Sequence, residues 1–185
     1  MARRPRRPTA ERLRRRALAH LERHPTSRAH LERLMLRRAL PEAALFDVDP
    51  EEVRGLVRAL LDDLERLRLL DDDRFAEGRA RRAIARGTAP RRVTAALAAK
   101  GVDADTVARA LGAVGEEIGD PAWQAALGYA RRRRLGPWRG PASPGEDTAE
   151  TRRRELAVMA RAGFDYATAR RLVSLEAGDE VPDAF

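Results

Sequence analysis

The residue types that most often carry metal or catalytic chemistry are scarce in this chain. It has no cysteine and only three histidines, His20, His24 and His30. His20 and His24 are four residues apart and could share a metal ion, but a zinc site needs three or four protein ligands and the sequence offers no third one nearby. There is also no Gly-rich phosphate loop. We therefore predict that the protein is not an enzyme and holds no metal ion or cofactor.

The acidic run Asp71-Asp72-Asp73 is the other group that could bind a cation. It stands directly before a predicted helix, where free backbone amides and the helix dipole stabilise carboxylates. A helix start explains these residues better than a metal site does.

Seven basic residues in the middle of the chain are the candidates for partner binding: Arg79, Arg81, Arg82, Arg86, Arg91, Arg92 and Lys100. Arg79, Arg82 and Arg86 follow an i, i+3, i+7 spacing, which puts them on one helix face. Such a face can bind an acidic protein surface or DNA phosphates. The alternative is a solvated face whose arginines pair with nearby carboxylates. The run Arg131–Arg134, at the end of another predicted helix, is open to the same two interpretations.

The net charge of +8 is concentrated at the N-terminus. Residues 1–30 contain ten arginines and two glutamates, so this stretch accounts for the whole excess and the rest of the chain is neutral overall. Residues 1–8 are predicted to form a mobile basic arm, whose attraction to phosphate would depend strongly on salt.

The periodic segments are all helical, and no stretch has the alternation of a strand. Capping residues and stops predict helices that begin at Thr9, Thr26 or Ser27, Asp49, Asp71, Pro90, Asp103, Pro121, Asp147 or Thr148, and Asp165. Pro41 is expected to end the second helix, which leaves a loop over residues 40–48. Gly87, Gly101 and Gly163 are expected to end three others.

Aromatic residues make up only 4% of the chain, so the core must consist mainly of Ala, Leu and Val. Phe75, Trp123, Phe164 and Tyr166 are predicted to pack in it. Trp138 lies in the Gly/Pro-rich loop 136–145 and is interpreted as an exposed anchor.

A repeat runs through the chain. When Asp49, Asp103 and Asp165 are aligned, each is followed by apolar residues at +4, +7 and +8. Repeated units that cannot bury their own apolar stripes must stack on one another. The predicted fold is all-α, with tandem three-helix, helix-turn-helix-like repeats in an elongated curved array. The predicted domains are the arm 1–8, repeat units 9–70, 71–115 and 116–175, and an acidic tail 176–185.

Several of these segments closely resemble the RecX family of recombination regulators. The resemblance covers roughly residues 10–175 and is carried by these stretches: Ser27-Arg28-Ala29-His30-Leu31-Glu32-Arg33-Leu34, Leu70-Asp71-Asp72-Asp73-Arg74-Phe75-Ala76, Arg81-Arg82, Ala89-Pro90-Arg91-Arg92-Val93, Leu97-Ala98-Ala99-Lys100-Gly101-Val102 and Arg161-Ala162-Gly163-Phe164-Asp165-Tyr166. The chain departs from the family pattern at Ala89, where a glycine is usual, in the loop 40–48, and in the length of the loop 136–145.

The resemblance implies a function. A RecX-like protein would be a negative modulator of RecA that binds RecA–single-stranded DNA filaments. It would inhibit their recombinase, ATPase and coprotease activities, and thereby regulate DNA repair and the SOS response. The RecA filament is then the expected partner, with additional DNA contact through the basic residues.

The alternative function is a general DNA-binding protein that uses helix-turn-helix units and the Arg-rich arm. Against it, the body of the chain is neutral and no unit shows an evident recognition helix. No apolar run approaches the ~20 residues that span a membrane, so we expect no membrane association. The lack of cysteine favours a reducing cytoplasm, and a monomer is the simplest expectation.

Overall fold

The computed structural model describes residues 5–140, 148–176, 179 and 181, and within these it is helical with no strand. The first four residues of the predicted arm, residues 141–145 of the predicted loop, Asp147 and most of the predicted tail lie outside the described residues. The chain divides into two compact units, Met1–Ala76 with Ala99–Asp103, and Glu77–Ala98 with Ala104–Phe185. The finer division into three repeat units stays a prediction.

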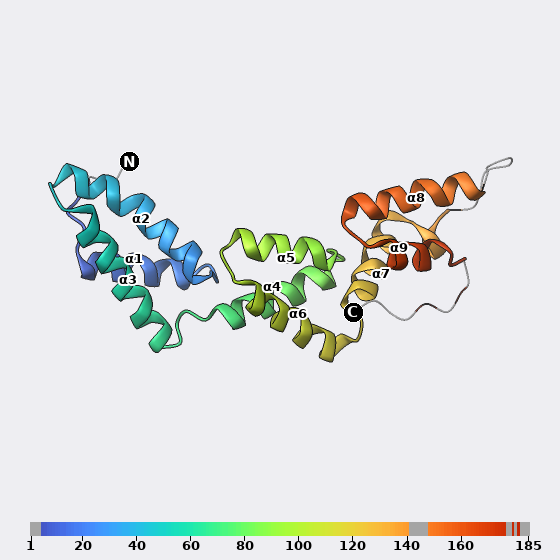
Figure 1. Cartoon of the computed structure of the whole chain (residues 1–185), viewed down its shortest axis with the longest axis horizontal. Helices are drawn as coiled ribbons and strands as arrows, with labels where there is room; N and C mark the ends of the chain where they lie inside the picture. Colours follow the sequence, from blue (N-terminus) through green and yellow to red (C-terminus); the bar gives the residue numbers. More distant parts are fainter. Residues whose placement is uncertain (1–4, 141–147, 177–178, 180, 182–185) are drawn as a thin grey trace. The chain divides into compact units, whose positions relative to one another are not determined.

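The first unit contains α1 (Ala10–Leu21), α2 (Arg28–Leu45), α3 (Pro50–Arg66) and the first turn of α4 (Asp72–Ala85), as Figure 1 shows. Capping side chains lie at the N-termini of these helices, as the sequence predicts. Thr9 and Ser27 each accept a hydrogen bond from the backbone amide three residues later, and Asp49 accepts one from the Glu51 amide, with Pro50 between them. The three helices enclose a core whose fully buried large side chains are Leu13, Leu31, Val53, Val57, Leu61 and Leu64.

The predicted end of α2 at Pro41 is wrong. The helix continues through the proline to Leu45, so the predicted loop 40–48 is reduced to a short turn around Asp47. An interior proline costs a helix roughly 3 kcal/mol because it lacks an N–H and crowds the preceding turn. Ala39 and Ala43, on either side of Pro41, are fully buried in the core of the first unit. The helix is therefore packed into the core on both sides of the proline.

Residues 99–103 join the first unit through specific contacts. The buried Ser27 hydroxyl donates to the Lys100 carbonyl at 2.6 Å, and the Arg33 guanidinium donates to the Ala99 carbonyl at 3.1 Å. Gly101 has a φ of +81°, and a Cβ at this position would lie 2.5 Å from the Ala29 Cβ. The predicted helix stop at Gly101 therefore also allows a close approach to α2.

His30 lies among cations in the first unit. Lys100 Nζ is 3.1 Å from His30 Nε2, and because an ammonium group only donates, the neutral ring accepts at Nε2. Partial burial lowers the pKa of His30 below its ordinary value of 6.5, and the charges of Lys100, Arg33, His20 and Arg37 lower it further. The pKa of His20 is also lowered, first by burial and then by His24.

Mild acid should therefore destabilise the first unit. The unfolded chain takes up these protons near the ordinary pKa of 6.5, whereas the folded chain resists them, so the free energy of unfolding should fall as pH drops from about 7.5 to 6. Urea unfolding followed by circular dichroism at the two pH values measures the effect. His30→Gln keeps an acceptor for Lys100 but does not titrate, and it should reduce the difference. A parent protein that is as stable at pH 6 as at about pH 7.5, or more stable, would contradict this account.

The second unit contains the rest of α4, then α5 (Pro90–Ala99) up to Ala98, α6 (Ala104–Ile118), α7 (Pro121–Arg133), a 3-10 turn η1 (Gly136–Trp138), α8 (Thr148–Ala162) and α9 (Tyr166–Val173). The predicted helix stops at Gly87 and Gly163 have positive φ angles. Phe164 and Trp123 are buried as predicted, but Tyr166 is 67% exposed, because as the first residue of α9 it points outward beside the capping Asp165.

The segment after α7 is more ordered than a loop prediction suggests. The Gly136 amide donates to Glu155 Oε2, and Arg139 Nη2 lies 2.9 Å from the same oxygen and 2.7 Å from the Val173 carbonyl. Glu155, on α8, is only 6% exposed. This network holds η1 against α8 and α9, and it leaves Trp138 half-buried rather than exposed as interpreted from the sequence.

Candidate basic binding surface

Arg79 and Arg82 on α4, with Arg86 directly after its last residue, form an exposed face, which we call the α4 arginine face. All three side chains are exposed, while Phe75 and Ile84 on the same helix are buried as predicted. Within the described chain, none of the three arginines forms an ion pair. The face therefore offers donors that no carboxylate of the described residues neutralises.

The other predicted site residues have partners inside the protein or lie elsewhere. Arg81 is bound by Glu117 of α6, with Nε and Nη2 at 2.9 and 2.5 Å from Oε2, and this hydrogen bond raises the pKa of Arg81. Arg91 is exposed at the start of α5. Lys100 belongs to the first unit through its contact with His30. Arg81 and Lys100 are thus largely engaged in structural contacts.

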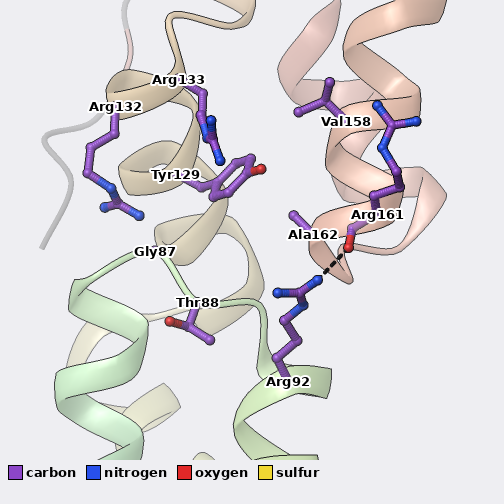
Figure 2. A pocket seen from close by; sticks show the side chains of 9 residues that line it. All are labelled: Gly87, Thr88, Arg92, Tyr129, Arg132, Arg133, Val158, Arg161 and Ala162. Atoms are coloured by element: carbon purple, nitrogen blue, oxygen red, sulfur yellow. Dashed lines mark hydrogen bonds between the residues drawn. The ribbon is translucent and has the colours of Figure 1, made fainter.

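Arg92 lies in a cavity of about 480 Å³ within the second unit, which we call the arginine pocket (Figure 2). Its walls are the turn between α4 and α5, the end of α7 and the end of α8. The lining residues are Gly87, Thr88, Arg92, Tyr129, Arg132, Arg133, Val158, Arg161 and Ala162. Four of the nine are arginines and none is acidic, so the pocket has a concentrated positive charge.

Contacts within the second unit shape this pocket. A Cβ on Gly87 would lie 2.5 Å from the Tyr129 amide nitrogen, so the turn after α4 packs directly on the backbone of α7. Arg92 Nη2 donates to the Arg161 carbonyl at 2.6 Å, the bond drawn in Figure 2. The Tyr129 ring is 5.4 Å from that of Phe164, and the Arg133 guanidinium carbon lies 5.9 Å from the Tyr129 ring centre. Aromatic and cation–π contacts therefore fix the tyrosine at the pocket wall.

Two negative findings apply to the described residues. Among them there is no group of three or more His, Asp or Glu side chains that could hold a metal ion. None of their helices combines the length and apolarity needed to cross a membrane.

Comparison with known proteins identifies the family. Residues 71–111 match the family model described as RecX, second three-helix domain. The regulatory protein RecX of Myxococcus xanthus (strain DK1622) is 34% identical over 170 residues, which cover 92% of this chain and 88% of the relative. The chain belongs to the RecX family. RecX of Thermobifida fusca (strain YX) is 32% identical over 157 residues, covering 84% and 74% of the two chains.

A solved RecX structure agrees with the fold. The crystal structure of RecX from Lactobacillus salivarius matches 89% of this chain and 94% of its own with a TM-score of 0.62, at 14% sequence identity. The likeness confirms the all-α, helical repeat fold predicted from the sequence. Both RecX relatives are named regulatory proteins.

The residues matched by the RecX model include all seven predicted site residues, but not the whole arginine pocket. Arg132, Arg133 and Arg161 lie outside residues 71–111. The sequence shows Arg132 and Arg133 as part of a basic run at a helix end. Their closeness to Arg92 depends on the packing of Gly87 against α7, which no local pattern reveals.

Proposed function

We propose that this RecX family member is a negative modulator of RecA. It would bind RecA–single-stranded DNA filaments and inhibit their recombinase, ATPase and coprotease activities, and so regulate DNA repair and the SOS response. The observation that carries the proposal is the 34% identity to a regulatory protein RecX over 92% of the chain.

The α4 arginine face is the surface we assign to the filament. Its three guanidinium groups are exposed and unpaired among the described residues, so a partner carboxylate or phosphate can bind them without first breaking an internal ion pair. A single exposed ion pair contributes only about 0.2–1 kcal/mol. A filament repeats the same surface along its length, so several weak contacts made at once would add as avidity.

Charge reversal on this face should weaken filament binding in steps. We expect Arg79→Glu, Arg82→Glu and Arg86→Glu each to raise the Kd for RecA–single-stranded DNA filaments by roughly two- to fivefold. The triple variant should lose more than any single one. Fluorescence anisotropy of labelled protein on preformed filaments measures this, with circular dichroism to check the fold.

Arg58→Glu is the matched control, because Arg58 is exposed on α3 and has no ion-pair partner among the described residues. It should leave the Kd nearly unchanged. Complete loss of binding in one single variant with an intact fold would argue against distributed contacts. An unchanged Kd in the triple variant would remove the α4 arginine face from the interface.

A further inference from the structure

We propose that the arginine pocket is a phosphate-binding site, which takes the phosphates of a single-stranded nucleic acid or of a free nucleotide. The proposal goes beyond the modulation of RecA, because the site lies within this chain and needs no RecA to bind its ligand. Four arginines and no acidic residue line one cavity, in which Arg161 faces Arg92 with its backbone carbonyl (Figure 2). None of Arg92, Arg132, Arg133 and Arg161 forms an ion pair within the described part of the chain.

The hydrogen-bonding groups of the pocket suit a phosphate. Each guanidinium has five N–H donors in a planar fork, which matches the oxygens of a phosphate, and the Thr88 and Tyr129 hydroxyls add two more donors. The bond from Arg92 to the Arg161 carbonyl uses one N–H and orients the rest of the fork before a ligand arrives. A pre-oriented donor loses less side-chain entropy on binding.

Size and lining favour phosphates attached to a nucleoside over the carboxylates of an acidic peptide. A cavity of about 480 Å³ has the volume of ordinary small-ligand sites. Arginines beside an aromatic ring are typical of sites for single-stranded nucleic acids, where the cations contact phosphates and the ring contacts a base. Tyr129 lies at the pocket wall (Figure 2) and would have no such role with a peptide carboxylate.

Helix ends provide the competing explanation for part of this charge. Arg132 and Arg133 are in the last turn of α7 and Arg161 is in the last turn of α8, where a cation stabilises the helix dipole. Reversing such a charge would then reduce stability but leave phosphate binding unaffected. A binding measurement therefore separates the two explanations.

The experiment measures binding of a fluorescent oligodeoxythymidylate, without RecA, to the full chain and to Arg132→Glu/Arg161→Glu. We expect the double variant to bind at least about tenfold more weakly, and the slope of log K against log salt to become shallower by about 1.4, as for two lost contacts to a single strand. Arg153→Glu is the control, because Arg153 is exposed on α8 but does not line the pocket. It should bind nearly as the parent does.

Competition identifies the source of the phosphate. Inorganic triphosphate and a nucleoside triphosphate should each displace the oligonucleotide. Tighter binding of the oligonucleotide would point to a strand, and tighter binding of the nucleoside triphosphate to a free nucleotide. Equal affinity of the parent and the double variant would overturn the proposal, and so would displacement by poly-glutamate as effective as that by triphosphate.

A second measurement covers the case in which the double variant does not fold. The parent protein is treated with an arginine-specific dicarbonyl reagent, with and without inorganic triphosphate, and the modified positions are read by mass spectrometry. Protection of Arg132 and Arg161 relative to Arg153 is expected. Equal modification at all three positions would contradict the pocket assignment. Neither result bears on the α4 arginine face, whose filament contacts are tested separately by the charge-reversal variants.

Discussion

Replacing Glu155 with alanine should lower the free energy of unfolding of the second unit by about 3 kcal/mol. Glu155 is 6% exposed and accepts hydrogen bonds from the Gly136 amide and from Arg139, whose side chain is only 17% exposed. Removal of the carboxylate leaves the Arg139 charge partly buried without its main partner and frees η1 from α8. Breaking a buried pair on one side costs more than the net contribution of the pair.

Both tryptophans, Trp123 and Trp138, lie in the second unit, so urea unfolding followed by their fluorescence reports on this unit. Glu116→Ala is the control, because Glu116 is exposed on α6 and should change stability by no more than about 0.5 kcal/mol. The double variant Arg139→Met/Glu155→Leu should recover much of the loss, since an apolar pair can replace a buried ion pair. A loss below about 1 kcal/mol for Glu155→Ala would show that the network contributes little.

Replacing Gly87 with alanine should destabilise the second unit by a comparable amount, about 3 kcal/mol. Gly87 has a φ of +68°, where a side chain costs roughly 1–2 kcal/mol. The added Cβ would lie 2.5 Å from the Tyr129 nitrogen and 2.9 Å from the Gly128 carbonyl carbon. Because both are backbone atoms, the turn and α7 must move apart, which adds an overpacking cost of about 1–3 kcal/mol.

Gly112→Ala is the matched control for this substitution. Gly112 is exposed within α6, and a Cβ there meets no atom within 4 Å. An alanine in a helix interior should stabilise the protein by roughly 0.5–1 kcal/mol relative to glycine. The same fluorescence-detected unfolding should therefore give opposite signs for the two substitutions. A destabilisation by Gly87→Ala of less than about 1 kcal/mol would mean that the turn adjusts without cost.

The helices could be predicted from the sequence because their ends are encoded locally. Thr9, Asp49 and Asp165 cap helices through their own side chains, and Gly87 and Gly101 end helices through their own backbone angles. The repeat of apolar positions depends on the same helical spacing and predicts the three-helix pattern of the RecX family.

The predictions are wrong where tertiary packing determines the end of a helix or the exposure of a side chain. Pro41 lies inside α2, and Ala39 and Ala43 on either side of it are packed in the core. Packing by other helices is not visible in the local pattern. An aromatic residue such as Tyr166 is expected in the core, whereas its position at the start of α9 leaves it exposed.

The positions of the basic residues follow from the sequence only in part, and their role in binding stays a prediction. The α4 arginine face follows from helical spacing alone, and the structure shows all three side chains exposed. The partner of Arg81 lies 36 residues away on α6, and the arginine pocket joins Arg92 to Arg161, 69 residues later. Such pairs depend on how helices pack, so sequence spacing could not reveal them.

The most direct test of the proposed function is the ATPase rate of the cognate RecA on single-stranded DNA, measured at fixed moderate salt while this protein is added. A RecA modulator should inhibit at well below one protein per RecA, and a chain that lacks residues 1–8 should still inhibit. No inhibition, or inhibition only when the protein saturates the DNA and only with the Arg-rich arm present, would contradict the proposal and favour a general DNA-binding protein.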